Sequence, residues 1–485
     1  MITFLIGLII LIVGGAVYGK ICERVLKPTD KETPAVSMKD GVDYVPMKKW
    51  KNSLIELLNI AGTGPILGPL QGILFGPIAF LTIPIGCVIG GAFHDYMTGM
   101  ISIRNKGEQT PSLVRRFLGR NLYLFYNVIV CLLMLLIGVV FIYTPGDLFV
   151  THIIEQKSEI SNPTVWIVYG VIFAYYILAT LFPIDRIIGR IYPVFGAVLL
   201  LSAVGVFIGI FVKGYPLVEV WNAAAAGYPY QGHFIPLFFV TVTCGILSGF
   251  HSTQATLVSR TVSDEREGRM TFYNMMIAEG FIAMTWAAAG MGALGLGLTD
   301  VNTISTAATT VVGVVAKDML GSVGGIIAII GVIVLPVTSG DTALRALRIM
   351  IGDAIHLDQT KKKNALLLAI CIFIVVAVVL FWAKGSPAGF GVLWRYFSWA
   401  NEMTAVFVCA MIAVYMKQNK MPYVMAVIPG TFYMYIVSCY ILSAQIGFRL
   451  PWPVSYILAG IFSIGYAVLL FRQGKRVRKK IAEDK

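Results

Sequence analysis

Hydrogen-bonding and ionisable side chains gather in residues 248–254 (SGFHSTQ), inside a run that is otherwise apolar enough to enter a lipid bilayer. Such a density of polar groups is costly in lipid and points to a ligand or ion pathway. Histidine and hydroxyl groups suit a carboxylate or an amide, and a histidine also titrates near neutral pH. Ordinary hydrogen bonding between packed helices is the structural alternative. The candidate ligand-binding residues of this stretch are Ser248, Gly249, His251, Ser252, Thr253 and Gln254.

A second stretch, residues 59–69 (NIAGTGPILGP), has three glycines and two prolines within residues 62–69. A continuous helix would lose backbone hydrogen bonds at both prolines. At membrane depth such a break is tolerated only where it is buried in protein or lines a cavity. A half-helix that begins near Pro65 would direct its positive end at an anion, whereas a simple kink or a close glycine contact between helices is the alternative. The candidate ligand-binding residues here are Asn59, Gly62, Thr63 and Gly64.

Carboxylates also lie inside apolar runs, where each can carry a coupling proton or form a structural ion pair. Asp95, beside His94, lies nine residues before Arg104, which is about 13 Å along a helix. Glu279 lies ten residues past Arg269, which is about 15 Å along its helix. The candidate ion-coupling residues are His94, Asp95, Glu279, Asp341 and Glu402.

Residues 336–342 (PVTSGDT) form a possible site for a small cation such as sodium, because hydroxyl and carboxylate oxygens are hard ligands. Thr338 and Ser339 would act there together with backbone carbonyls near Ala61. An ion pair between Asp341 and Arg345, four residues apart on one helix face, is the simpler explanation of that carboxylate.

Membrane-spanning helices must position these residues, because the 485-residue chain is 57% hydrophobic and only 13% charged. Soluble domains carry about 25% charged residues, and a hydrocarbon core of about 30 Å needs about 20 residues per span. We predict thirteen spans, of which the second and seventh are broken. They lie near 2–19, 54–72, 74–103, 122–145, 164–183, 187–212, 234–258, 271–297, 320–343, 364–383, 390–416, 421–443 and 453–471.

The basic residues test this topology. We place the N-terminus outside the cell, treat residues 1–19 as an anchor helix and let successive spans cross the membrane in alternating directions. This topology places seven segments in the cytoplasm, and they hold 32 of the 38 Lys and Arg residues. The positive-inside rule requires such a bias. The largest of these segments are the loop 20–53 and the basic tail 472–485. We therefore expect a multi-pass protein with a cytoplasmic C-terminus, in contact with lipid and not with nucleic acid.

Spans two to six (54–213) and seven to eleven (234–416) both open with a broken span, and their starts are offset by 180 to 203 residues. Because five is an odd number, the second set must be inverted relative to the first. An all-α fold with a five-plus-five inverted repeat places a solute site where the two breaks meet near the membrane midplane. Two accessory helices follow in residues 421–471.

Other functional classes lack support in the sequence. It has no GxxxxGK[ST] stretch for ATP, and its seven cysteines show no metal-type or disulfide-type spacing. We therefore expect no cofactor, no metal site and no enzymatic activity.

Five motifs resemble the carbon starvation (CstA) family over nearly the whole membrane region. They are AGTGPILGP (61–69), GGAFHDYMTGMISIRNKG (90–107), SGFHSTQ (248–254), TSGDTALRALRIMIGDAI (338–355) and LWRYFSWANE (393–402). The family is placed with the amino acid–polyamine–organocation transporters, so the resemblance implies a LeuT-like inverted-repeat fold. It also implies a bacterial inner-membrane importer of pyruvate or short peptides, with proton coupling proposed. This chain is short for the family, and Glu402 stands where members commonly carry Gln.

The sequence thus predicts a secondary transporter that works by alternating access and holds its substrate between residues 62–64 and 248–254. The substrate would be a small organic anion such as pyruvate, or a short peptide, and protons would drive uptake. Sodium is the alternative coupling ion. A channel and a membrane sensor without transport are the alternative functions, and the oligomeric state stays open.

Overall fold

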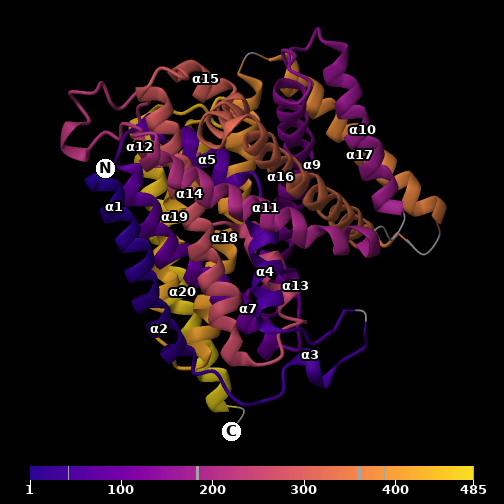
Figure 1. The fold of residues 1–485 in the computed structure, drawn as a ribbon. Coiled ribbons are helices and arrows are strands. Elements are labelled where there is room, and N and C mark those ends of the chain that lie inside the picture. Colours follow the sequence, from indigo (N-terminus) through magenta and orange to yellow (C-terminus); the bar gives the residue numbers. More distant parts are fainter. Residues whose placement is uncertain (42, 182–184, 358–361, 387, 484–485) are drawn as a thin grey trace.

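The computed structural model describes residues 1–41, 43–181, 185–357, 362–386 and 388–483. The secondary structure of these residues is helical, apart from one isolated β-bridge between Met47 and Val262. Figure 1 shows that many of the helices run along one common direction, and that the start of α1 and the end of α20 lie at opposite ends of the molecule. This arrangement is typical of a helical membrane protein.

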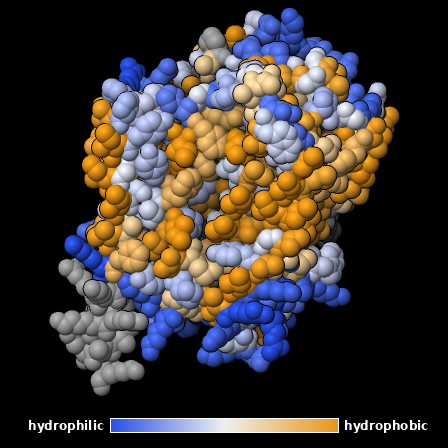
Figure 2. Space-filling model, turned by 90° about the vertical axis from the view of Figure 1, so that its left-hand side faces the viewer, coloured by the Kyte–Doolittle hydropathy of each residue, from blue (hydrophilic) through white to orange (hydrophobic). Residues whose placement is uncertain are grey.

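Nine helical segments among the described residues are long and apolar enough to cross a membrane, and one bent pair, Lys49–Ile60 with Gly64–Phe75, makes a tenth. Figure 2 shows an apolar belt between two ends where hydrophilic residues gather. The chain is therefore a multi-pass membrane protein. The nine segments are Ile2–Leu26, Ala79–Arg104, Arg120–His152, Glu265–Gly295, Ala308–Gly352, Lys363–Gly385, Gly389–Gln418, Val424–Ser443 and Trp452–Arg472.

Three of the thirteen predicted spans are not among these ten. Pro163–Ala179 and Gly196–Val212 are shorter apolar helices. The predicted span 234–258 is helical mainly in its second half, among the residues that the structure describes. The total of thirteen and the inverted repeat therefore remain predictions.

The structure extends most predicted spans by a few residues, since polar helix ends continue beyond the apolar run. In the N-terminal half the helices are α1 (Ile2–Ile9), α2 (Gly15–Leu26), α3 (Pro34–Ser37), α4 (Lys49–Ile60), α5 (Gly64–Gly72), α6 (Ala79–Gly86), α7 (Ala92–Arg104), α8 (Thr110–Leu118), α9 (Arg120–His152), α10 (Pro163–Leu181) and α11 (Asp185–Val212). π-Helical turns at Ile10–Gly14 and Cys87–Gly91 join α1 to α2 and α6 to α7.

The second half contains two elements that differ from the predicted spans. The predicted start at residue 320 lies next to Gly321, whose φ of 71° interrupts α16, so that an additional helical segment from Ala308 precedes the predicted span. The π-helical turn Arg269–Tyr273 precedes α14. The helices here are α12 (Phe234–Leu237), α13 (Gly249–Val258), α14 (Asn274–Gly295), α15 (Val301–Thr306), α16 (Ala308–Ala354), α17 (Lys362–Gly385), α18 (Gly389–Gln418), α19 (Val424–Ser443) and α20 (Trp452–Glu483).

Two groups of helices position the site. The first, which we call the inner bundle, consists of α4, α5, α6, α7, α13 and α14, which pack against one another. The second, the flanking helices, consists of α9, α10, α16 and α17; α9 packs along α16, and α10 lies beside α17 at the edge of the molecule (Figure 1). Helix α18 contacts both groups.

One buried ion pair joins the flanking helices. Lys384 of α17 donates to both oxygens of Asp147 of α9 at 2.9 and 3.0 Å, and the two side chains are only 4% and 9% exposed. Tyr169 of α10 and Ser158 also donate to the Asp147 carboxylate, at 2.5 and 2.7 Å. This pair therefore fixes three helices to one another.

We expect Lys384→Met to lower the free energy of unfolding by about 3–5 kcal/mol, because it leaves the Asp147 charge buried without its cation. The measurement is unfolding in detergent micelles, followed by circular dichroism. The double variant Lys384→Met/Asp147→Leu should recover most of this loss. A double variant as unstable as the single one would contradict the explanation.

Candidate functional site

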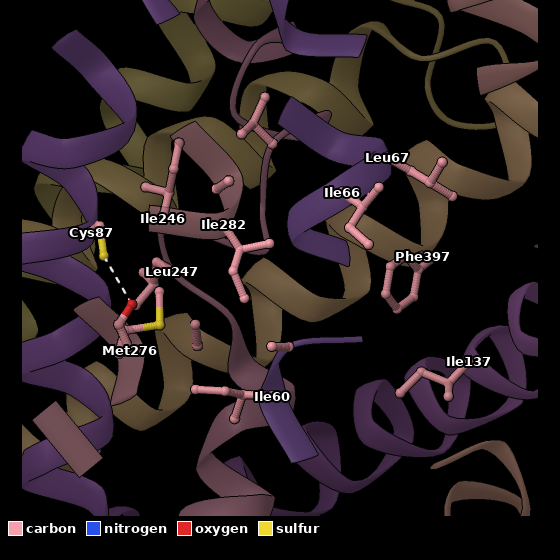
Figure 3. Close-up of a cluster of buried hydrophobic side chains, with 14 of the residues drawn as sticks. Ile60, Ile66, Leu67, Cys87, Ile137, Ile246, Leu247, Met276, Ile282 and Phe397 are labelled. Carbon is pink, nitrogen blue, oxygen red and sulfur yellow. Dashed lines mark hydrogen bonds between the residues drawn. The ribbon is translucent and has the colours of Figure 1, made fainter. Parts of the chain in front are cut away.

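The first predicted break is confirmed and lies at Ala61–Thr63, between α4 and α5, whose axes differ by 50°. Gly64 and Pro65 are the first two residues of α5, as expected for a proline that lacks an N–H donor. Figure 3 shows Ile60 at the end of α4 and Ile66 and Leu67 on α5, on the two sides of this break. The break is buried among helices of the inner bundle.

This break leaves polar groups without partners. The N–H groups of Thr63 and Gly64 have no hydrogen-bond acceptor among the described residues. The hydroxyl of Thr63 is fully buried and also has no partner there. Asn59 lies one turn earlier on α4 and is half-buried. The start of α5 therefore offers donors to an anion, in the positive field of a helix N-terminus.

The predicted position of the second break is wrong. Residues 249–254 are helical and form the first turns of α13, whereas the irregular backbone lies before them, in residues 238–248. Ser248 is extended, with φ −131° and ψ 123°, and Gly245 has φ 91°. The polar side chains that suggested a break instead begin a helix. We call residues 238–248 the irregular segment.

Asn401 of α18 explains why the helix starts at Gly249. Its Oδ1 accepts the N–H of Phe250 at 2.7 Å and the hydroxyl of Ser248 at 3.2 Å. An N–H of the first turn of α13 is thus capped by a side chain 151 residues away. A sequence pattern cannot show a cap supplied by another helix.

We expect Asn401→Ala to lower the free energy of unfolding by about 1–3 kcal/mol, because it leaves buried donors unpaired. Thermal unfolding in detergent would measure the loss. Ser398→Ala on the same helix is the matched control, since Ser398 is 1% exposed and its hydroxyl has no partner among the described residues. Equal losses for both variants would contradict the capping role.

The two irregular backbones touch. A Cβ added to Gly64 would lie 2.4 Å from Sγ of Cys244, and one added to Gly68 would lie 2.8 Å from the carbonyl oxygen of Thr241. Glycine is required at both positions because no side chain fits. Figure 3 shows Ile246 and Leu247 of the irregular segment beside Ile282 of α14. This closed contact joins the first break to the irregular segment, whereas the sequence prediction placed the contact at residues 248–254.

Beside this contact lies a chain of buried ionisable groups. Asp95 of α7 accepts from Nδ1 of His94 at 2.8 Å and from Nδ1 of His251 at 3.1 Å. Nε2 of His251 lies 3.6 Å from the carboxylate of Glu279 on α14. All four side chains are at most 1% exposed. The structure thus brings together four predicted residues from three helices, α7, α13 and α14.

Two further residues of this site were missed by sequence reasoning. Glu56 of α4 is fully buried, and its carboxylate interacts electrostatically with Asp95, His251 and Glu279. Cys244 lies beside His251. Glu56 could have been identified from the sequence, because it is a carboxylate inside a predicted span. Cys244 could not, because a single cysteine in an apolar run does not indicate a functional site. We call Glu56, His94, Asp95, His251 and Glu279 the acid cluster.

The acid cluster has the geometry of a proton-binding site. Asp95 accepts from Nδ1 of His251, which directs Nε2 of that histidine toward Glu279. The oxygens of Glu56 and Glu279 have no hydrogen-bond partner among the described residues. Cys244, His251 and Glu279 also have ligand atoms within 4.8 Å of one another, so a test of this site must include transition metals.

The remaining predicted residues have other environments. Glu402 is fully buried but lies beside Thr243 and Tyr433. Asp341 accepts from the hydroxyl of Tyr175 at 2.6 Å. The side chain of Thr338 lies outside the described residues, so the cation site with Ser339 and Ala61 stays a prediction.

The other polar side chains at the start of α13 form hydrogen bonds within this helix. The hydroxyls of Ser252 and Thr253 donate to carbonyls three residues earlier, at 2.6 and 2.7 Å. Gln254 donates to the hydroxyl of Thr253 at 3.3 Å. These bonds lie within α13 and are structural, although they do not join packed helices as the alternative for this stretch predicted, whereas His251 is the residue that faces the acid cluster.

Known structures share this architecture. A manganese transporter of Eremococcus coleocola superposes with a TM-score of 0.58 over 93% of this chain and 100% of its own, at 12% sequence identity. At this identity the likeness concerns the fold alone. It agrees with an all-helical membrane-protein fold.

Sequence relatives are closer. An uncharacterized membrane protein of Haemophilus influenzae is 41% identical over 336 residues, which cover 60% of this chain and 91% of that protein. Peptide transporter CstA of Mycobacterium tuberculosis is 24% identical over 336 residues, and pyruvate/proton symporter BtsT of Escherichia coli is 23% identical over 323 residues. The chain spans 44% and 45% of the lengths of these two transporters.

The family model of carbon starvation protein CstA matches residues 1–153 and 137–295, which is more than half of the chain. The match includes the first break, the irregular segment, α13 and every residue of the acid cluster. The chain therefore belongs to the carbon starvation protein CstA family.

Proposed function

We propose that this protein is a secondary active transporter that imports a small organic acid or a short peptide together with protons. The observation that carries the proposal is the contact between two irregular backbones directly beside the acid cluster. Paired interruptions of membrane helices are the usual place where transporters bind their solute. Buried carboxylates and histidines at membrane depth are the usual proton carriers.

The start of α5 would bind the carboxylate of the substrate. Two backbone N–H groups and the Thr63 hydroxyl are available there, and no cation is needed because the helix end is positive. Pyruvate and a peptide C-terminus share this carboxylate. The contact between Gly64 and Cys244 leaves no room for a solute in the closed arrangement, so the irregular segment must move away from the start of α5 to admit it. Alternating access would also rock the inner bundle against the flanking helices.

The acid cluster would carry the proton. Three carboxylates and two histidines share a buried space, and even with both imidazoles protonated the carboxylates would leave one net negative charge. Burial of an uncompensated charge is strongly unfavourable. An additional proton removes this cost, so the closed arrangement is favoured when a proton is bound.

Uptake into proteoliposomes tests this function. We expect labelled pyruvate or dipeptides to accumulate when the lumen is more alkaline than the medium, and a protonophore to abolish the accumulation. Replacement of sodium by choline and addition of EDTA should change nothing, which separates protons from sodium and transition metals. Non-saturating flux without a gradient would indicate a channel. Ligand-induced thermal stabilisation without uptake would indicate a sensor.

A further inference from the structure

Glu56 occupies a distinctive place in the acid cluster, because it lies on the first half of a broken span. Helix α4 ends at Ile60, and a 50° bend over residues 61–63 separates it from α5. Glu56 is fully buried, and neither of its oxygens has a hydrogen-bond partner among the described residues. Its carboxylate instead interacts electrostatically with Asp95, His251 and Glu279.

The start of α4 is clasped by the residues that follow α13. Asn52 donates to the carbonyl of Thr261 at 3.0 Å and accepts from its hydroxyl at 2.8 Å. Met47 donates through its N–H to the carbonyl of Thr261 at 3.0 Å and accepts from the hydroxyl of Ser263 at 3.1 Å. We call Met47, Asn52, Thr261 and Ser263 the clasp. The clasp lies at the end of α4 that the topology predicts to face the cytoplasm.

The clasp residue Asn52 and the carboxylate of Glu56 lie on the same side of α4. Asn52 and Glu56 are four residues apart, so they lie on the same face of the helix, separated by one turn. That face is directed at α13 and its C-terminal extension, where His251 and Thr261 lie. A displacement of α4 away from α13 would therefore separate both contacts at once.

The charges that face Glu56 come from three helices. Helix α13 presents His251, α14 presents Glu279, and Asp95 beside His94 comes from α7. The π-helical turn before α14 contributes Tyr273 and Arg269, and Arg269 is paired with Glu23. Glu267 interacts electrostatically with Lys49 at the start of α4. Gly196 of α11 faces Leu58, and the α11 side chains at 185–193 lie outside the described residues.

The charge of an ionised Glu56 is disfavoured first by complete burial and then by the like charges of Asp95 and Glu279, whereas a protonated His251 attracts it. Repulsion acts between α4 and both α7 and α14. The four hydrogen bonds of the clasp can be replaced by water at the membrane surface. By contrast, the repulsion in the dry interior is relieved only by a proton or by movement of α4.

We propose that Glu56 links proton occupancy of the acid cluster to opening of the clasp. While the cluster holds its additional proton, α4 stays packed against α13 and the clasp is closed. Release of that proton leaves Glu56 facing Asp95 and Glu279, and α4 moves away and opens a path at this end. The inference rests on the proton-carrying role of the cluster in the proposed function.

Hydrogen–deuterium exchange of the full-length protein in lipid nanodiscs tests this link. Protection of peptides that cover residues 44–53 and 256–264 would be compared at about pH 6 and about pH 8, after correction for intrinsic exchange. We expect the protection of the wild-type clasp to fall by about tenfold or more at the higher pH, which is the effect of one pKa unit of linkage. In Glu56→Gln the protection should change less than about twofold.

Ser53→Ala is the matched control, because Ser53 is the buried neighbour of Asn52 and its hydroxyl has no partner among the described residues. It should keep the wild-type pH response, whereas Asn52→Ala should have low protection at both pH values. Peptides of α18 must keep wild-type protection, which verifies folding. A wild-type clasp without a pH response, or a Glu56→Gln variant that keeps it, would overturn the inference.

The experiment needs neither substrate nor gradient, so its outcome is separate from the uptake assay. Proton-driven uptake with a clasp that does not respond to Glu56 would refute the link and leave the transporter proposal intact. A clasp that responds to Glu56 in a protein without proton-driven uptake would refute the proposed function while the link between Glu56 and the clasp remained.

Discussion

His251→Ala is expected to abolish proton-driven accumulation, with initial uptake rates reduced by about 10²–10⁴-fold, the usual contribution of a positioned acid–base group. His251 lies 3.1 Å from Asp95 through Nδ1 and 3.6 Å from Glu279 through Nε2. Without it the two carboxylates lose their shared donor. The cluster could then no longer exchange a proton between α7 and α14 through one imidazole. The measurement is uptake by proteoliposomes under an imposed pH gradient.

A counterflow assay separates coupling from folding and binding. Exchange of labelled for unlabelled substrate requires no net proton movement, so His251→Ala should retain far more exchange than gradient-driven accumulation. His233→Ala is the control, because His233 is an exposed histidine that stacks on Trp452 at 3.8 Å, away from the cluster. Undiminished dependence of uptake on the pH gradient in His251→Ala would remove this histidine from the coupling mechanism.

Gly64→Ala is expected to lower substrate uptake by about tenfold to a hundredfold, as an overpacking cost of about 1–3 kcal/mol implies. The added Cβ would lie 2.4 Å from Sγ and 2.5 Å from Cβ of Cys244, so the two irregular backbones could not close on each other. The same cost should appear as a lower melting temperature in detergent. Initial uptake rates and thermal unfolding measure the two effects.

Gly62→Ala is the matched control two residues earlier. Its added Cβ would meet only Cζ of Phe141 at 3.8 Å, an ordinary van der Waals distance. The double variant Gly64→Ala/Cys244→Gly removes both clashing atoms and should recover part of the uptake, as a double-mutant cycle requires for residues in contact. Equal losses in Gly62→Ala and Gly64→Ala would show that steric contact with Cys244 is not the cause.

Hydropathy, charge bias and the Gly-Pro stretch sufficed to predict a multi-pass helical membrane protein with a helix break within residues 59–69. These properties depend on residues adjacent in the chain. An apolar run of about 20 residues must span the bilayer, and a helix cannot continue unchanged through Gly62–Pro65. The motifs also predicted the family correctly. The number of spans depends on how α10, α11 and the segment 234–258 are assigned, which hydropathy alone could not decide.

The composition of the site depended on packing between helices far apart in the sequence. Asp95 and His251 were each predicted, but their contact spans 156 residues. Glu402 had the same local signal as Asp95, yet packing places it beside Thr243 and Tyr433. The second break lies at residues 238–248 and not at 248–254, because the side-chain amide of Asn401 caps the helix that begins with the polar residues. Local patterns describe what one segment can form by itself, whereas these contacts follow from which helix faces meet.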